Sequence, residues 1–191
     1  MSFTSNHSLL KKLLLALILT ASSLALRADI LVNGDFANGR ASWAGDAAPE
    51  SSSSLIINLD DKHWTKVSQT FNTHENELNF SVTFQLSPDG EFSKGKSKIN
   101  GEISHIIGRK LKKGHPITLP KNSWVLILAD YAKELVTTVA IPSKAGVTGT
   151  QTVTGTIPRL EAHEEKTLFL AFPPGHGTVT LSNISLTPTH P

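Results

Sequence analysis

Apolar and polar residues alternate with a period of two along much of the chain, the pattern of β-strands with one dry and one wet face. The clearest run covers residues 78–86, where Leu, Phe, Val, Phe and Leu alternate with polar residues before a Pro-Asp-Gly turn. Further strands are predicted at 30–32, 55–59, 64–71, 124–129, 135–141, 151–157, 167–172 and 178–186. Short strands separated by Gly, Pro, Asn and Ser clusters predict an all-β fold, an antiparallel β-sandwich.

Two departures from simple alternation carry information. The strand at 124–129 is apolar on both faces, which is typical of a central, buried strand. Near the C-terminus Val179 and Leu181 share one face, but Ile184 and Leu186 are shifted by one residue. An extra residue around 182–183 would restore the phase, so the sequence predicts a bulge there.

The remaining segments show weaker patterns. A turn of helix is predicted at 130–135, and 173–177 (Pro-Pro-Gly-His-Gly) is typical of a hairpin turn. Residues 44–54 and 92–120 are expected to be loose, since Ser, Gly and Lys interrupt their apolar pieces. Residues 188–191 form a short polar tail after a single domain at 29–187.

Residues 1–28 have the features of a secretory signal peptide. Lys11 and Lys12 precede an apolar and small-residue run at 13–26, which is short for a membrane span. Cleavage could follow Ala25 or Ala28, and we favour Ala28 because it leaves the apolar strand at the new N-terminus. A signal anchor is the disfavoured alternative. We therefore expect a secreted protein, extracellular or periplasmic, with no membrane span in the mature chain.

Charge and cysteine content narrow the function classes. Removing the leader takes away three basic residues and no acid, so the mature chain has 15 basic against 16 acidic residues. This near-neutral balance does not favour nucleic acid as a partner. The chain has no cysteine, so an exported domain of this size must be stabilised by packing rather than by disulfides.

The two ends of the predicted domain carry a family resemblance. LVNGDFANGRASW at 31–43 and TVTLSNISLTP at 178–188 resemble the opening and closing strands of galactose-binding-like jelly rolls, especially the carbohydrate-binding modules of bacterial cellulases and xylanases. The resemblance implies that the ends lie side by side and that Phe36 and Trp43 enter the core. It also implies a polysaccharide or cell-surface glycan as partner.

The sequence departs from this family where a structural calcium is often held. At the positions of the family's two carboxylates this chain has Ala37 and Ser182. Asp35 and backbone carbonyls alone would supply few of the oxygen ligands, and little of the negative charge, that calcium needs. We therefore expect no cofactor and no tight metal site, with a weak calcium near Asp35 left open.

Aromatic side chains that could stack on sugar rings are few. With Trp43 assigned to the core, the candidate ligand contacts are Trp64, Trp124 and Tyr131. For Trp64 the alternative is a half-buried residue that caps the sandwich, and for Trp124 it is the core, because its strand is apolar on both faces.

A basic stretch offers a second candidate site. Its members could bind an anionic glycan, or they could protect an edge strand from aggregation, which we favour because no stacking aromatics accompany them. They are Lys94, Lys96, Lys98, Arg109, Lys110, Lys112 and Lys113.

Catalysis finds little support in the sequence. There is no Gly-x-Ser-x-Gly or His-Glu-x-x-His motif, and the histidines show no metal-ligand spacing. The leading hypothesis is a secreted, non-catalytic carbohydrate-binding-like module. The alternative is a structural or adhesive protein of the bacterial envelope that uses the same fold for protein contacts, and a jelly-roll hydrolase or lyase is a third, disfavoured possibility.

Overall fold

The computed structural model describes residues 29–47, 53–92, 99–110, 117–130, 135–144, 149–158 and 164–189. Its strands are β1 (Ala44–Gly45), β2 (Leu55–Asn58), β3 (Thr65–Thr73), β4 (Leu78–Leu86), β5 (Glu91–Phe92), β6 (Ser123–Asp130), β7 (Leu135–Pro142), β8 (Gln151–Ile157), β9 (Glu164–Phe172), β10 (Gly175–His176) and β11 (Thr178–Pro188). A short helix, α2 (Asn100–Ile106), lies between β5 and β6 in the chain.

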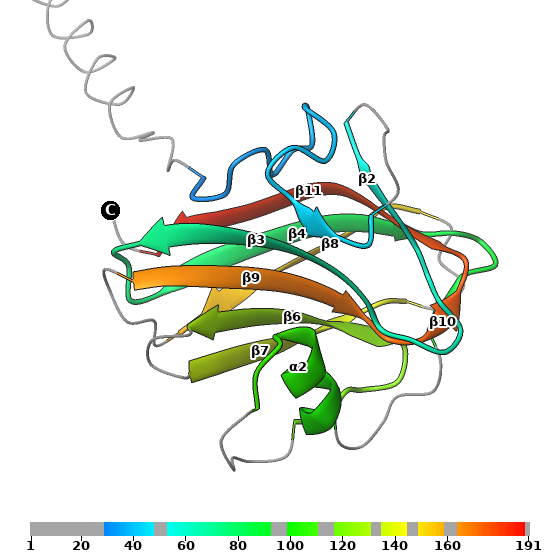
Figure 1. Ribbon diagram of the computed structural model, residues 1–191. Coiled ribbons are helices and arrows are strands. Elements are labelled where there is room, and N and C mark those ends of the chain that lie inside the picture. The colour runs from blue at the N-terminus through cyan, green and yellow to red at the C-terminus, as the bar shows by residue number, and fades with distance from the viewer. Residues whose placement is uncertain are drawn as a thin grey trace, which may run out of the picture.

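The strands form two main layers that face each other (Figure 1). One layer is a five-stranded sheet in the order β1-β3-β9-β6-β7, and the other is a four-stranded sheet in the order β2-β11-β4-β8. A small pairing of β10 with β5 lies apart from both. All pairings are antiparallel, so the predicted all-β sandwich is confirmed.

Trp124, near the start of β6, lies in the interior between the two sheets. Its ring is 5.4 Å from that of Phe84 on the opposite sheet, in an edge-on arrangement, and 4.9 Å from that of Phe172 on the neighbouring strand β9. All three side chains are fully buried. The aromatic cluster therefore joins the two layers by burying a large apolar area between them.

The outer face of the five-stranded sheet is also covered. Val125 and Ile127 point away from the interior and pack with Phe169 against Ile103 and Ile106 of α2. In Figure 1, α2 accordingly lies beside β6 and β7. The predicted two-sided burial of the central strand is confirmed, and the element that covers it is the helix.

Lys66 of β3 holds the end of this helix. Its Nζ donates a hydrogen bond to the carbonyl oxygen of Ile106 at 2.6 Å and lies 5.9 Å from the ring centroid of Phe169. A cation at a helix C-terminus satisfies a carbonyl that has no partner within the helix. This contact fixes α2 to the sheet beyond its apolar packing.

The segment before β1 is organised around Asn33. Its Nδ2 donates to the carbonyl oxygens of Gly39 and Ala41, both at 2.9 Å, and the indole Nε1 of Trp43 donates to the Asn33 carbonyl oxygen at 3.2 Å. Phe36 is completely buried, with its ring 5.6 Å from that of Trp43. The core positions expected for these two aromatics are confirmed.

The two ends of the domain meet at Gly34 and Ile184. The backbone N–H of Ile184 donates to the Gly34 carbonyl at 2.8 Å, and a Cβ on Gly34 would overlap the carbonyl oxygen of Ile184. Beside this contact, the register of β11 against β4 shifts between Leu181 and Asn183. The predicted bulge is confirmed, and glycine is required at position 34 by a close backbone approach.

Two predicted elements differ from the structure. Residues 30–32 form bends and a turn rather than a strand. The backbone N–H of Ile30 donates to the Leu186 carbonyl, but Asn33 and Phe36 then have positive φ angles of 56°, which bend the chain away from β11. Of the turn of helix predicted at 130–135, Asp130 is the last residue of β6 and Leu135 the first of β7, and residues 131–134 lie outside the described residues. β11 also extends to Pro188, one residue into the expected polar tail.

The segments expected to be loose are partly ordered. The range 44–54 contains β1, and 92–120 contains α2, while 48–52, 93–98 and 111–116 lie outside the described residues. The hairpin turn expected at 173–177 contains the two-residue strand β10.

A buried ion pair lies at one end of the interior. Lys166 of β9 donates to Asp130 of β6 at 2.8 Å, and the two side chains are 1% and 5% exposed. Both face inward, in step with the apolar residues of their strands. Removing one member of a buried ion pair lowers the free energy of unfolding far more than replacing both members together, because a single buried charge is left without a partner.

We expect Gly34→Ala to lower the free energy of unfolding by about 1–3 kcal/mol, since the new methyl group overlaps the Ile184 carbonyl. Gly101→Ala is the matched control, because a Cβ there meets no atom within 4 Å and alanine favours the helix. Urea denaturation of both variants measures the difference. Equal stability of the two variants would contradict the close approach.

We expect Asp130→Asn alone to cost about 3–5 kcal/mol of unfolding free energy, because it leaves the Lys166 ammonium buried without a counter-charge. Lys166→Met combined with Asp130→Asn should recover most of this loss, since no unpaired charge remains. A double-mutant cycle by chemical denaturation tests the coupling, and additive losses would show that the pair is not coupled.

Candidate functional site

The outer face of the four-stranded sheet carries a continuous set of uncharged polar side chains. In β4 the inward residues are buried and apolar, whereas the alternate, outward ones are Asn79, Ser81, Thr83 and Gln85. On the edge strand β8, the outward positions are three exposed threonines at 152, 154 and 156. The strict alternation of both strands therefore places hydroxyl and amide groups on one surface.

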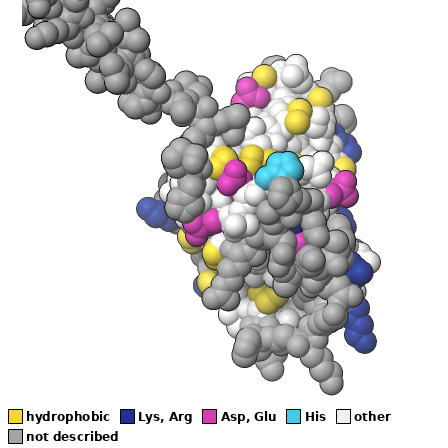
Figure 2. All heavy atoms as spheres, turned by 90° about the vertical axis from the view of Figure 1, so that its left-hand side faces the viewer, with side chains coloured by type: hydrophobic (Ala, Val, Ile, Leu, Met, Phe, Trp, Pro, Cys, Tyr) yellow, Lys and Arg dark blue, Asp and Glu magenta, His cyan; other side chains and the backbone are white. Residues whose placement is uncertain are grey.

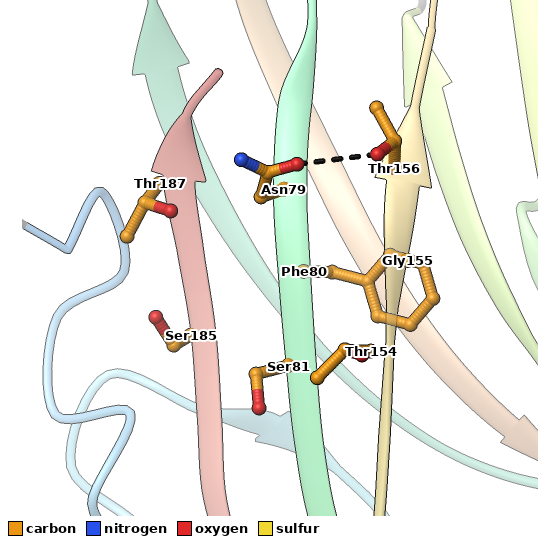
Figure 3. Close-up of a pocket in the computed structure, with 8 residues that line it drawn as sticks. All are labelled: Asn79, Phe80, Ser81, Thr154, Gly155, Thr156, Ser185 and Thr187. Carbon is orange, nitrogen blue, oxygen red and sulfur yellow. Dashed lines mark hydrogen bonds between the residues drawn. The ribbon is translucent and has the colours of Figure 1, made fainter. Parts of the chain in front are cut away.

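Six of these side chains form two rows of three across β11, β4 and β8 (Figure 3). The pairing register aligns each row: Thr187, Asn79 and Thr156 in one, and Ser185, Ser81 and Thr154 in the other. β11 contributes its two members from the stretch after the bulge.

The hydroxyl groups of this grid differ in availability. Thr156 Oγ1 donates to Asn79 Oδ1 at 3.1 Å, so this hydroxyl and this amide oxygen already have a partner. Within the described structure, the hydroxyls of Ser81, Thr154 and Ser185 have no hydrogen-bond partner. They are free to exchange bonds with water or with a ligand.

Between the two rows the surface is hollowed. The hollow has a volume of about 360 Å³ and is lined by the six polar residues together with Phe80 and Gly155. The Phe80 ring lies against Gly155, where a Cβ would come within 2.6 Å of it, and Figure 3 shows the ring between Thr154 and Thr156. A polar rim over an aromatic residue is a common composition for a small ligand site.

The sequence had predicted different residues for ligand contact. Trp124 is fully buried in the core, so it cannot touch a ligand at the surface, and its assignment to the candidate site is corrected. Trp64 is half-buried, as its alternative had it, but it packs against the cluster between α2 and the outer face of the five-stranded sheet rather than over the interior between the sheets. Tyr131 lies outside the described residues.

The basic stretch is described only in part. Arg109 and Lys110 are exposed just after α2, while Lys94, Lys96, Lys98, Lys112 and Lys113 lie outside the described residues. On the end of the sandwich seen in Figure 2, the described Lys and Arg side chains lie at the margins rather than in one patch. Anion binding by the complete stretch stays a prediction.

The described acids do not gather into a metal site. The part of the chain that the structure covers contains no group of three or more His, Cys, Asp or Glu residues placed to hold an ion. The Oδ1 of Asp35 accepts a hydrogen bond from the backbone N–H of Ala37 at 3.1 Å, which occupies one of its oxygens. Backbone N–H groups of Lys62 and His63 hold the pKa of the exposed Asp60 below its ordinary value, but Asp60 does not line the hollow.

The sequence predicted that these strands have a polar face, but not that their polar faces form one surface. The alternation in 78–86 and 151–157 predicts a wet face on each strand, but pattern alone does not show that the two strands are neighbours. Ser185 and Thr187 join them only because of the bulge.

Comparison with known proteins supports the fold. No protein-family model matches the chain, and no curated protein matches it in sequence. Among solved structures, the enzymatically active domain of bacteriophage CBA120 tailspike protein 4 matches with a TM-score of 0.52 and 6% identity, over 83% of this chain and 21% of that one. Arabinose-bound MgGH51 α-L-arabinofuranosidase matches with a TM-score of 0.50 and 13% identity, over 84% and 26%.

Carbohydrate-binding modules are also among the matches. TmCBM61 in complex with β-1,4-galactotriose has a TM-score of 0.49 and 9% identity, over 84% of this chain and 99% of that one. TmCBM61 is a carbohydrate-binding module, the class of protein that the sequence resembles, and at 9% identity the match is one of fold alone. Among the described residues, no helix has the length and apolar character needed to cross a membrane.

We expect neither EDTA nor added calcium to change the melting temperature. An ion held tightly near Asp35 would raise the unfolding free energy by about 2.7 kcal/mol at a concentration 100 times its Kd. Differential scanning calorimetry with EDTA and with calcium measures the shift. Asp35→Asn should behave identically, because the amide oxygen can still accept from Ala37, and a calcium response lost in this variant would reveal a site.

Proposed function

We propose that this protein is a secreted, non-catalytic carbohydrate-binding-like module, and that its outer hydroxyl face takes a neutral polysaccharide or cell-surface glycan. The observation that carries the proposal is the uncharged polar grid around the hollow, on a sandwich of the carbohydrate-binding type. The position of the site is our own inference from the geometry.

The chemistry of the grid suits sugar hydroxyls. Serine and threonine hydroxyls both donate and accept, so they can match sugar hydroxyls of either orientation. None of the eight residues that line the hollow is charged, which favours a neutral over an anionic glycan. The lining also supplies no carboxylate, imidazole or amine for proton transfer, and this supports binding without catalysis.

The expected affinity is modest for a single sugar unit. The lining includes no Trp or Tyr, so stacking on the apolar face of a sugar ring is limited to the largely buried Phe80. Each hydrogen bond contributes only about 0.5–1.5 kcal/mol net. Binding therefore has to accumulate along a chain of sugars, which makes a polymer the suitable partner.

We expect Ser81→Ala combined with Thr154→Val to weaken binding to a neutral polysaccharide by about tenfold, as two hydrogen bonds are lost. Affinity electrophoresis across neutral and acidic polysaccharides, followed by calorimetry on the best binder, measures this. Thr180→Val is the matched control, since Thr180 faces outward on the same sheet but does not line the hollow.

Two outcomes would count against the proposal. Equal affinity of the double variant and the control would remove the hollow as the binding site. Absence of binding to every neutral glycan, with retention of the protein in envelope fractions through protein contacts, would favour the structural or adhesive alternative.

A further inference from the structure

β8 is a sheet edge that no other described strand covers. Within the described part of the chain it pairs with β4 alone, and its backbone makes no hydrogen bond to any other described residue. Its seven residues, Gln-Thr-Val-Thr-Gly-Thr-Ile, include no charge and no proline. Natural proteins usually protect such an edge with lysine, proline, a bulge or a covering segment, because its free N–H and C=O groups invite another strand.

The burial pattern shows that the middle of this edge, residues 152–156, is open to solvent, whereas Ile157 and the Nε2 of Gln151 at its two ends are buried. In β4 every inward residue is buried and every outward residue is half-buried. Along β8, Val153 and Gly155 remain half-buried on the inward face, and the outward threonines are exposed. The opposite edge of the same sheet differs, since β2 has four residues and a bridge from Ala47 to Ile57 covers part of it.

We propose that β8 pairs antiparallel with β8 of a second copy of this chain, about a two-fold axis that passes through Thr154. Thr154 is the middle residue of the strand, so this register uses all seven residues. Each residue keeps its face across the axis: Gln151 opposes Ile157, Thr152 opposes Thr156, Val153 opposes Gly155, and Thr154 opposes itself. A two-fold interface requires such self-complementarity.

The threonines that oppose each other in this register match in size and chemistry. Threonine meets threonine on the outward face, as Thr83 and Thr152 already do within the chain, with their hydroxyls 3.0 Å apart. On the inward face Val153 lies opposite Gly155, which adds no side chain of its own. The edge carries no charge, so a second copy meets no repulsion, and this favours self-pairing as the occupant.

A cysteine at the axis tests the register directly. The chain has no native cysteine, and opposed Cα atoms in an antiparallel pair lie about 4.5–5.5 Å apart, within disulfide range. We expect Thr154→Cys to form a disulfide-linked dimer under mild oxidation at least about tenfold faster than Thr180→Cys, because pairing raises the effective concentration at the axis. Thr180 faces outward on β11, two strands from the edge.

Sedimentation velocity of the full chain gives a second readout. The unmodified protein should show a concentration-dependent dimer, which Thr154→Lys abolishes by placing like charges at the axis, whereas Thr180→Lys retains it. Circular dichroism confirms that both lysine variants are folded. Equal cross-linking of the two cysteine variants would overturn the proposal. These measurements use no glycan, so they are independent of the proposed function.

Discussion

The register shift in β11 is the constraint on which the arrangement of both faces depends. Before the bulge, Val179 and Leu181 face inward, and a strand without an extra residue would turn Ser185 inward as well. The shift instead buries Ile184 and places Ser185 in the outer grid. Because Gly34 packs against the Ile184 carbonyl, the N-terminal segment secures the strand where its phase changes.

The strands could be predicted from the sequence because each large sheet has a consistent dry face. Residues 78–86 and 151–157 match β4 and β8 to the residue, and apolar side chains on both faces of β6 indicated that it lies inside its sheet, between β9 and β7. The helix α2 was missed although Ile103, Ile106 and Ile107 have helical spacing. Seven residues interrupted by glycine are too few for periodicity to identify a helix without its partner surface.

The candidate site was harder to predict than the fold, for a physical reason. Aromatic side chains were the predicted ligand contacts, since they bind sugars by stacking. In this sandwich, however, Trp43 and Trp124 fill the interior and Trp64 packs between the helix and the sheet. What remains at the surface is the polar half of an alternating pattern. Such a pattern predicts a solvated face and becomes a candidate site only when pairing brings three strands together.

The hydroxyl face and the open edge lie on the same sheet, and this joins the two proposals physically. β8 contributes Thr154 both to the grid and to the proposed two-fold axis, so pairing of two copies would continue the outward threonines from one sheet into the next. In the proposed function, a single grid without stacking aromatics would bind each sugar weakly. Two grids in one continuous sheet would engage a polymer at several points, and linked sites gain affinity without any new type of contact. A polymer ligand and a paired edge therefore strengthen each other.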